Sequence, residues 1–224
     1  MKRLLLTIAI LMGCIMIYAQ EKVLSPIRHL VKPANHVEKA LLTERYHFAY
    51  IAYPALVDYG CIGLSFNYDN MKLTLCKQRK PTPEEENNPQ ITICHNKHEM
   101  KISKEQADAL FSLFTSAVYS SSFTSEESTI FDGCLHEFIV GINAGTTRSP
   151  MEENNCKHLV SITNKLCQCI EKQAPEYIDT MMNEIKELTD IFVSYYPFEI
   201  SKHSVIYDIH KRNNVKGPSV GLKE

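Results

Sequence analysis

The sequence has no large excess of acidic over basic residues, or of basic over acidic ones. Its 224 residues include 24 Lys or Arg and 26 Asp or Glu, which leaves a formal charge of −2 at neutral pH. Proteins that bind nucleic acid usually present a clustered basic surface, so we expect no nucleic-acid partner. Gly is scarce as well, with eight residues, which excludes a collagen-like chain. Because 44% of the residues are hydrophobic, a disordered chain is also excluded.

The standard signatures of catalysis and cofactor binding are also missing. The chain contains no GxGxxG, Walker A, GxSxG, HExxH or CxxC motif. We therefore expect no cofactor, and an enzyme would have to assemble its catalytic groups from distant segments. The interpretation we favour is a protein that binds another protein or a small ligand without catalysis. An immunity- or inhibitor-type protein and a small hydrolase are the alternatives.

Long hydrophobic runs are absent except at the start of the chain. Lys2 and Arg3 precede an apolar run at 4–18, which is shorter than the roughly 20 residues of a membrane-spanning helix. This arrangement, followed by the small Ala19, is typical of a secretory signal peptide. We predict a signal peptide at 1–19 and export to the periplasm or exterior of a Gram-negative bacterium. The mature chain is expected to have no transmembrane segment and to meet another envelope protein as its partner.

A second processing route involves Cys14. The sequence Leu11-Met12-Gly13-Cys14 is similar to the lipobox of bacterial lipoproteins, in which a lipidated cysteine becomes the first mature residue. Met at the second position and the apolar residues 15–18 after the cysteine favour ordinary signal-peptide cleavage instead.

Seven of the eight cysteines lie after the predicted signal peptide, so at least one thiol stays free even if every possible bridge forms. Cys76 and Cys94 are the candidate disulfide, because they fall on same-parity faces of two short strands that could be neighbours. Cys156, Cys167 and Cys169 fall in one predicted helix, where geometry prevents most mutual pairs. Buried free thiols are the alternative for all of them.

Hydrophobic alternation with a period of two predicts strands between residues 46 and 102. The clearest pattern is a hairpin over 62–76 with Asp69-Asn70 as its turn. Residues 77–90 contain three Pro and three consecutive Glu, so we predict a loop there. The polar residues 95–98 are predicted to turn the next strand back on itself.

Helical spacing dominates the second half of the chain. A capping box at Ser103 and Gln106 predicts the start of a long helix. Two more helices are predicted to begin near Asn154 and Pro175, joined by a short link as an antiparallel pair. A short helix is predicted after Asn35.

Strand-rich and helix-rich stretches are partly segregated along the chain. We therefore predict an α+β fold, an antiparallel sheet of hairpins with three or four helices packed on one face. The expected organisation is a single domain at 20–210 followed by a flexible tail at 211–224. A strand or bent hairpin is predicted at 130–143 and a last edge strand at 204–209.

Cys134 and His136 are the candidate nucleophile and base of a hydrolase. In a strand, Asp132, Cys134 and His136 share one face, and a thiolate beside an imidazole is the beginning of a nucleophilic site. Side chains two positions apart on one strand have Cβ atoms ~6.5–7 Å apart, so contact requires favourable rotamers. The alternative is an Asp-Gly turn followed by a cysteine that packs inside.

Cys94, His95 and His98 are the candidate metal ligands. Three side chains of these types within five residues could begin a Zn²⁺ or Cu²⁺ site. On a strand, however, positions 95 and 98 project to opposite faces, so a tight turn would have to bring the imidazoles together. The alternative is a pair of exposed histidines in a turn.

Thr147, Arg148 and Ser149 are the candidate ligand-binding residues. Backbone donors, hydroxyls and one guanidinium could hold an anion if this stretch is a loop that leads into the helix near Asn155. The alternative is an ordinary connecting loop.

One resemblance extends over about a third of the chain, from Ile102 to Cys169. This run combines a capped helix, an Asp-Gly turn with an aromatic residue two positions past His136, and Ser149-Pro150 before a helix. It resembles small secreted proteins of unknown function found in Bacteroidota. The triplet Asp179-Thr180-Met181 is also similar to the short O-glycosylation sequon of that group. Neither resemblance implies an activity.

Overall fold

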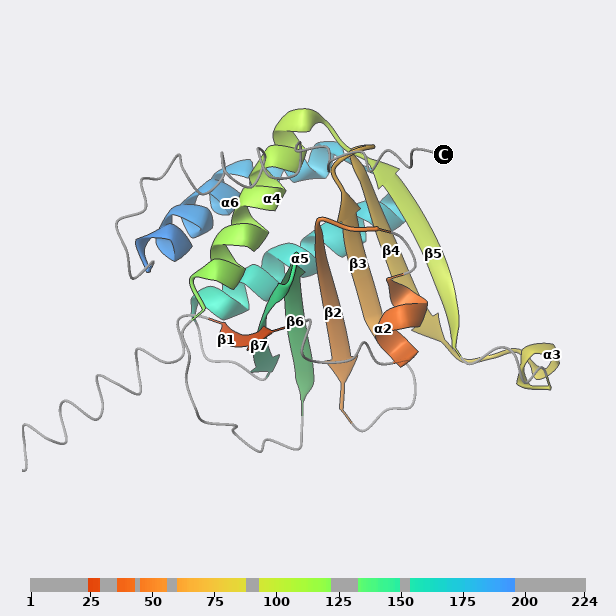
Figure 1. Cartoon of the computed structure of the whole chain (residues 1–224). Helices are drawn as coiled ribbons and strands as arrows, with labels where there is room; N and C mark the ends of the chain where they lie inside the picture. The colour runs from red at the N-terminus through yellow and green to blue at the C-terminus, as the bar shows by residue number, and fades with distance from the viewer. Residues whose placement is uncertain are drawn as a thin grey trace, which may run out of the picture.

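A computed structural model of the protein (Figure 1) describes residues 24–28, 36–42, 45–55, 60–87, 93–121, 133–149 and 154–195. The signal peptide predicted at 1–19, Asp132, the strand predicted at 204–209 and the tail predicted at 211–224 lie outside these residues.

The described strands form one seven-stranded antiparallel sheet in the order β1-β7-β6-β2-β3-β4-β5. Strands β1 and β5 are its two edges. Glu99 of β5 forms two ion pairs, with Lys97 of the same strand at 2.7 Å and with Lys72 of the neighbouring β4 at 3.2 Å. The strands are β1 Ser25–Arg28, β2 Phe48–Pro54, β3 Ile62–Asn67, β4 Lys72–Arg79, β5 Cys94–Lys101, β6 Cys134–Val140 and β7 Asn143–Ser149.

The long helices lie together on one face of the sheet (Figure 1), and the α+β fold class is confirmed. Helix α6 packs against α4 and α5. None of the described helices combines the length and the apolar character that crossing a membrane requires. The helices are α2 His36–Leu41, α3 Pro83–Glu86, α4 Lys104–Tyr119, α5 Asn155–Lys172 and α6 Glu176–Ser194.

The short helix α2 lies on the opposite face of the sheet, over β3 and β4 (Figure 1). Its buried Leu41 packs directly against the backbone of Gly63. A Cβ atom at position 63 would lie only 2.6 Å from the Cβ of Leu41, so this close approach requires glycine.

Stacked aromatic rings join the sheet to the helices. Phe48 of β2 stacks on Phe66 of β3 with ring centroids 5.0 Å apart, and on Phe114 of α4 with centroids 4.1 Å apart. All three side chains are fully buried. Burial of rings of this size supplies much of the hydrophobic free energy that holds α4 on the sheet.

The capping box predicted at the start of α4 is confirmed. The hydroxyl of Ser103 accepts from the backbone of Gln106, and the Gln106 side chain accepts from the backbone of Ser103 at 2.9 Å. The side-chain nitrogen Nε2 of Gln106 also donates to the carbonyl oxygen of Pro175 at 3.0 Å and to the carboxylate of Asp179 at 2.8 Å. These bonds hold the first turns of α4 and α6 together, and the two helices run in the same general direction (Figure 1).

Two segments predicted as loop or turn contain regular structure. Strand β4 continues to Arg79, and the four-residue helix α3 lies within the predicted loop at 77–90. Strand β5 pairs with β4 without a break from Cys94 to Lys101, so the turn predicted at 95–98 is wrong. The continuous ladder of backbone hydrogen bonds outweighs the polarity of these residues, because side chains of an edge strand stay in contact with water.

Candidate functional site

The most buried of the predicted catalytic residues is His136, on the helix-facing side of β6. Its Nδ1 lies 2.8 Å from the hydroxyl oxygen of Tyr50 on β2, and the two rings are stacked with an interplanar angle of 11°. Burial lowers the pKa of His136 to about 4, and burial also raises the pKa of Tyr50 well above its usual value. At neutral pH the phenol therefore keeps its proton, the imidazole is neutral, and the two groups share one hydrogen bond whose direction depends on the tautomer of the imidazole.

Cys134 lies at the start of the same strand and is only half-buried. Burial, together with the nearby Cys61, raises the pKa of the Cys134 thiol. Its sulfur lies 3.7 Å from the carbonyl oxygen of Leu135, the adjacent residue. A nucleophilic cysteine requires a lowered pKa, usually beside a protonated histidine. The structure places Cys134 near His136 on one strand, but with a protonated thiol and a neutral imidazole.

The predicted anion loop is strand β7, so the loop prediction is wrong. In the register with β6, Thr147 is opposite His136 and Arg148 is opposite Leu135, so consecutive side chains point to opposite faces. Ser149 ends the strand. Thr147 hydrogen-bonds the thiol of Cys156 at the start of α5, and burial raises the pKa of that thiol to about 12. Thr147 and Arg148 cannot hold the same anion from opposite faces.

The predicted metal ligands are dispersed along β5. Cys94 and His98 share one face but are four residues apart, about 13 Å along an extended strand. His95 points to the opposite face. In the described parts of the chain, no three side chains of the kinds that bind metals converge. The candidate disulfide does not form either, because the register offsets Cys76 and Cys94 by three residues and places them on opposite faces of the sheet.

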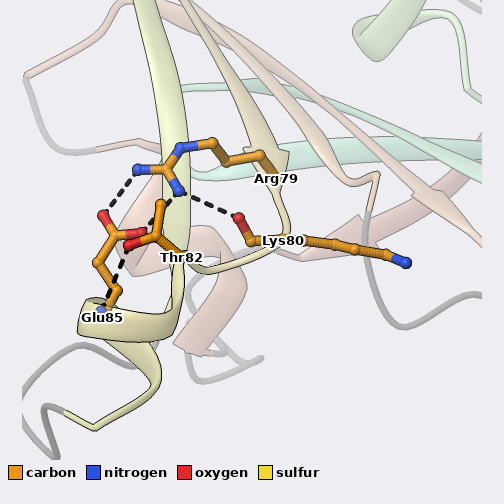
Figure 2. A network of polar contacts seen from close by, with 4 residues as sticks. All are labelled: Arg79, Lys80, Thr82 and Glu85. Atoms are coloured by element: carbon orange, nitrogen blue, oxygen red, sulfur yellow. Dashed lines mark hydrogen bonds and ion pairs between the residues drawn. The ribbon is translucent and has the colours of Figure 1, made fainter.

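Cys94 instead contacts a polar network of Arg79, Lys80, Thr82 and Glu85 that lies between the end of β4 and α3. Figure 2 shows these four residues. Both oxygens of Glu85 accept from the guanidinium of Arg79 at 2.7 Å, and one also accepts from the backbone of Thr82 at 2.8 Å. The same guanidinium donates to the carbonyl of Lys80 at 3.0 Å. The thiol of Cys94 adds a further hydrogen bond to Glu85. Mainly because of Arg79, the pKa of Glu85 is far below its usual range. The network anchors α3 rather than offering a reactive group.

A cavity of about 630 Å³ lies between α4 and α6. Its floor is apolar: Ile185 is fully buried and Met182 almost so, with Ala109 beside them. Charged side chains form its rim, where Lys104 pairs with Asp108 at 2.6 Å. The lining residues are Lys104, Glu105, Asp108, Ala109 and Ser112 of α4, and Met182, Ile185, Lys186, Thr189 and Asp190 of α6. We call this cavity the α4/α6 cleft.

Tyr68 of the β3–β4 turn supports one wall of the α4/α6 cleft. Its hydroxyl donates to Asp108 and accepts from Lys104 at 3.2 Å. Burial and the hydrogen bond to Asp108 raise the pKa of Tyr68, so the phenol remains protonated at neutral pH. These contacts fix the two charged side chains at the end of the cleft where α4 begins.

A smaller cavity of about 320 Å³ lies between α5 and α6. Lys165 and Glu184 pair across it at 2.8 Å. Thr180, from the triplet that is similar to a glycosylation sequon, is exposed beside it, and its hydroxyl donates to the carbonyl of Tyr177 at 2.7 Å.

Compared with known proteins, the chain matches no family model, no curated protein and no solved structure. The site is therefore defined by its geometry alone.

Sequence reasoning missed the α4/α6 cleft, although it placed both helices. The apolar residues of α6 recur at helical spacing, which is typical of core packing, and Ile185 and Met182 are buried. The missed signal is the set of charged residues that flank the apolar stripe on both helices, at 104–108 and 186–190. A sequence does not say which two helices lie side by side, so it could not join these two halves.

Proposed function

We propose that the protein is an exported binding protein of the bacterial cell envelope, which holds its ligand in the α4/α6 cleft without catalysis. The observation that carries this proposal is the cleft itself, about 630 Å³ in volume, with an apolar floor and a charged rim. Binding sites commonly have this size, an apolar lining, and a few polar groups that orient the ligand.

The protonation states elsewhere favour binding over thiol chemistry. The thiol of Cys134 has a raised pKa, and His136 is held neutral by burial. Neither residue lines the α4/α6 cleft or the smaller cavity between α5 and α6. A hydrolase built on this pair would need an accessible thiolate next to its substrate.

Export is supported by the pattern at 1–19 and is compatible with the free cysteines. Burial raises the pKa of both Cys156 and Cys167 to about 12. Only a thiolate reacts readily with oxidants or disulfides, so these buried thiols resist oxidation in a compartment that lacks a reducing system.

Ligand binding is tested with a fluorescent apolar anion, 1-anilinonaphthalene-8-sulfonate. We expect the wild-type protein to bind the probe, and Ala109→Trp to abolish binding because the indole fills the α4/α6 cleft. The matched control is Glu187→Trp on the exposed side of α6, which adds the same ring outside the cleft. Absence of probe binding by the wild type, or equal binding by both variants, contradicts the proposal.

Export is tested by fractionating cells of a Gram-negative host and sequencing the N-terminus of the product. We expect a chain outside the cytosol that begins at Gln20. A cytosolic product that retains Met1 contradicts this part of the proposal.

A further inference from the structure

The walls of the α4/α6 cleft follow the helical repeat. The lining positions occur three and four residues apart on both helices and extend over about 10 Å of each. Both rows run along the helix axes, so a ligand that contacts every lining position lies along these axes. The rows are 104, 105, 108, 109 and 112 on α4, and 182, 185, 186, 189 and 190 on α6.

The floor is shaped to receive an apolar ridge. Ala109 and Ser112 are small and half-buried, which leaves room above the buried Met182 and Ile185. Methionine adapts its unbranched side chain to the shape of whatever packs on it. The side chains of an amphipathic helix form such a ridge when apolar residues recur every three or four positions.

The rim carries charges of both signs that are available to a partner. Glu105, Lys186 and Asp190 are exposed and have no ion-pair partner among the described residues. The bond from Gln106 to Asp179 sets the starts of the two helices level, so Glu105 lies near one end of the cleft. Lys186 lies about two turns further along and Asp190 about one turn beyond it. Beside the Lys104–Asp108 pair, these three charges follow one another along the rim as negative, positive, negative.

Resting on the proposed function, we propose that the occupant is an amphipathic α-helix of a partner protein, laid lengthwise along α4 and α6. It presents an acidic residue to Lys186 and basic residues to Glu105 and Asp190. An elongated apolar groove with a patterned rim is the usual receptor for such a helix. A small amphiphile with one charge would satisfy only part of this rim and would be repelled by the rest.

The test uses two synthetic helical peptides of about 18 residues with the same apolar stripe. The first places Lys, Glu and Lys opposite Glu105, Lys186 and Asp190, and the second places Glu, Lys and Glu there. We expect the first peptide to bind about tenfold more tightly in fluorescence anisotropy at low salt, because three exposed ion pairs change from attractive to repulsive. High salt should reduce the difference.

A charge reversal in the protein provides the control. Lys186→Glu should reduce or invert the preference between the peptides, whereas Lys101→Glu, the same change on β5 outside the cleft, should leave it unchanged. Equal affinity of the two peptides, or binding of neither, overturns this inference. Self-association that Ala109→Trp abolishes also overturns it, in favour of a second copy as the occupant.

The two proposals fail separately. If anilinonaphthalene sulfonate binds in the α4/α6 cleft and neither peptide displaces it, the cleft is a small-molecule site and only the helical partner is excluded. If neither the probe nor the peptides bind, the proposed function fails as well.

Discussion

The hydroxyl of Tyr50 and Nδ1 of His136 are hydrogen-bonded across 2.8 Å, although the two residues are 86 positions apart in the chain. Both side chains lie on the helix-facing side of the sheet, and Tyr50 belongs to the main hydrophobic core. The bond satisfies two buried polar groups that would destabilise the fold if they were left unpaired. Its energetic importance is therefore structural, and it depends on a neutral imidazole.

Acidification should destabilise the protein through His136. The pKa of this imidazole is about 4 in the folded protein against 6.5 for an ordinary histidine, so between these values only the unfolded chain takes up the proton. Each pKa unit of difference corresponds to about 1.4 kcal/mol, so the free energy of unfolding should fall by about 3 kcal/mol as the pH drops from 6.5 to 4. Urea titrations over this pH range measure the loss.

The variant His136→Asn isolates this contribution, since its side-chain amide can still hydrogen-bond to Tyr50 but does not titrate. Carboxyl groups contribute to the pH dependence of both proteins, so the difference between them is the relevant quantity. Parallel pH profiles for wild type and variant would exclude a buried neutral His136.

The thiols should react with iodoacetamide in the order of their exposure. Cys61 and Cys134 are half-buried and should be modified first, but slowly, because burial raises the pKa of both. The remaining five, all buried, should react only when the protein unfolds. Intact mass spectrometry over time, with and without denaturant, counts the modified thiols. A single, rapidly modified Cys134 at neutral pH would instead support the hydrolase. The five buried thiols, which should react only on unfolding, are those of Cys76, Cys94, Cys156, Cys167 and Cys169.

Removal of the Glu85 carboxylate should loosen α3 without unfolding the protein. Glu85→Ala leaves the guanidinium of Arg79 and the backbone of Thr82 without the acceptor that they share. Because the segment lies outside the hydrophobic core, the midpoint of thermal unfolding should change little. Limited proteolysis between Lys80 and Asn87 should become faster. The matched control is Glu84→Ala, one position away, and equal cleavage of both variants would contradict the role of the network.

A methyl group at position 63 should displace α2. Gly63→Ala puts a Cβ atom 2.6 Å from that of Leu41. The shifts that such overpacking forces typically cost about 1–3 kcal/mol. The free energy of unfolding, measured in urea, should fall by this amount. In the double variant Leu41→Gly/Gly63→Ala the opposing Cβ is gone, so the two changes should be less than additive. Strict additivity would show that α2 does not rest on Gly63.

Local signals made most of the helices predictable from the sequence. The capping box of Ser103 and Gln106 is contained within four residues, and the apolar stripe that follows it repeats at helical spacing. The same holds for Asn154, whose side chain accepts from the backbone of Lys157 at 2.9 Å and begins α5. Such features depend only on neighbours in the chain, so they can be recognised without the fold.

The errors arose where distant segments decide the structure. The polar run at 95–98 has the composition of a turn, yet pairing with β4 keeps it extended. Residues 147–149 likewise form a strand because β7 pairs with β6. The contact between His136 and Tyr50, and the meeting of α4 with α6 at the cleft, join residues that no local pattern connects.

Strand β5 is an edge strand, to which a strand of another molecule could add, since among the described strands it pairs with β4 alone. Lys97, Glu99 and Lys101 alternate along that edge and place a row of hydrated charges there, in which Glu99 pairs with Lys97 and with Lys72 of β4. A neighbouring molecule that tried to extend the ladder would have to strip water from each of them. The charged edge at β5 therefore discourages fibre-like association of copies through this strand. Recognition of a partner is proposed instead for the helical face, at the α4/α6 cleft.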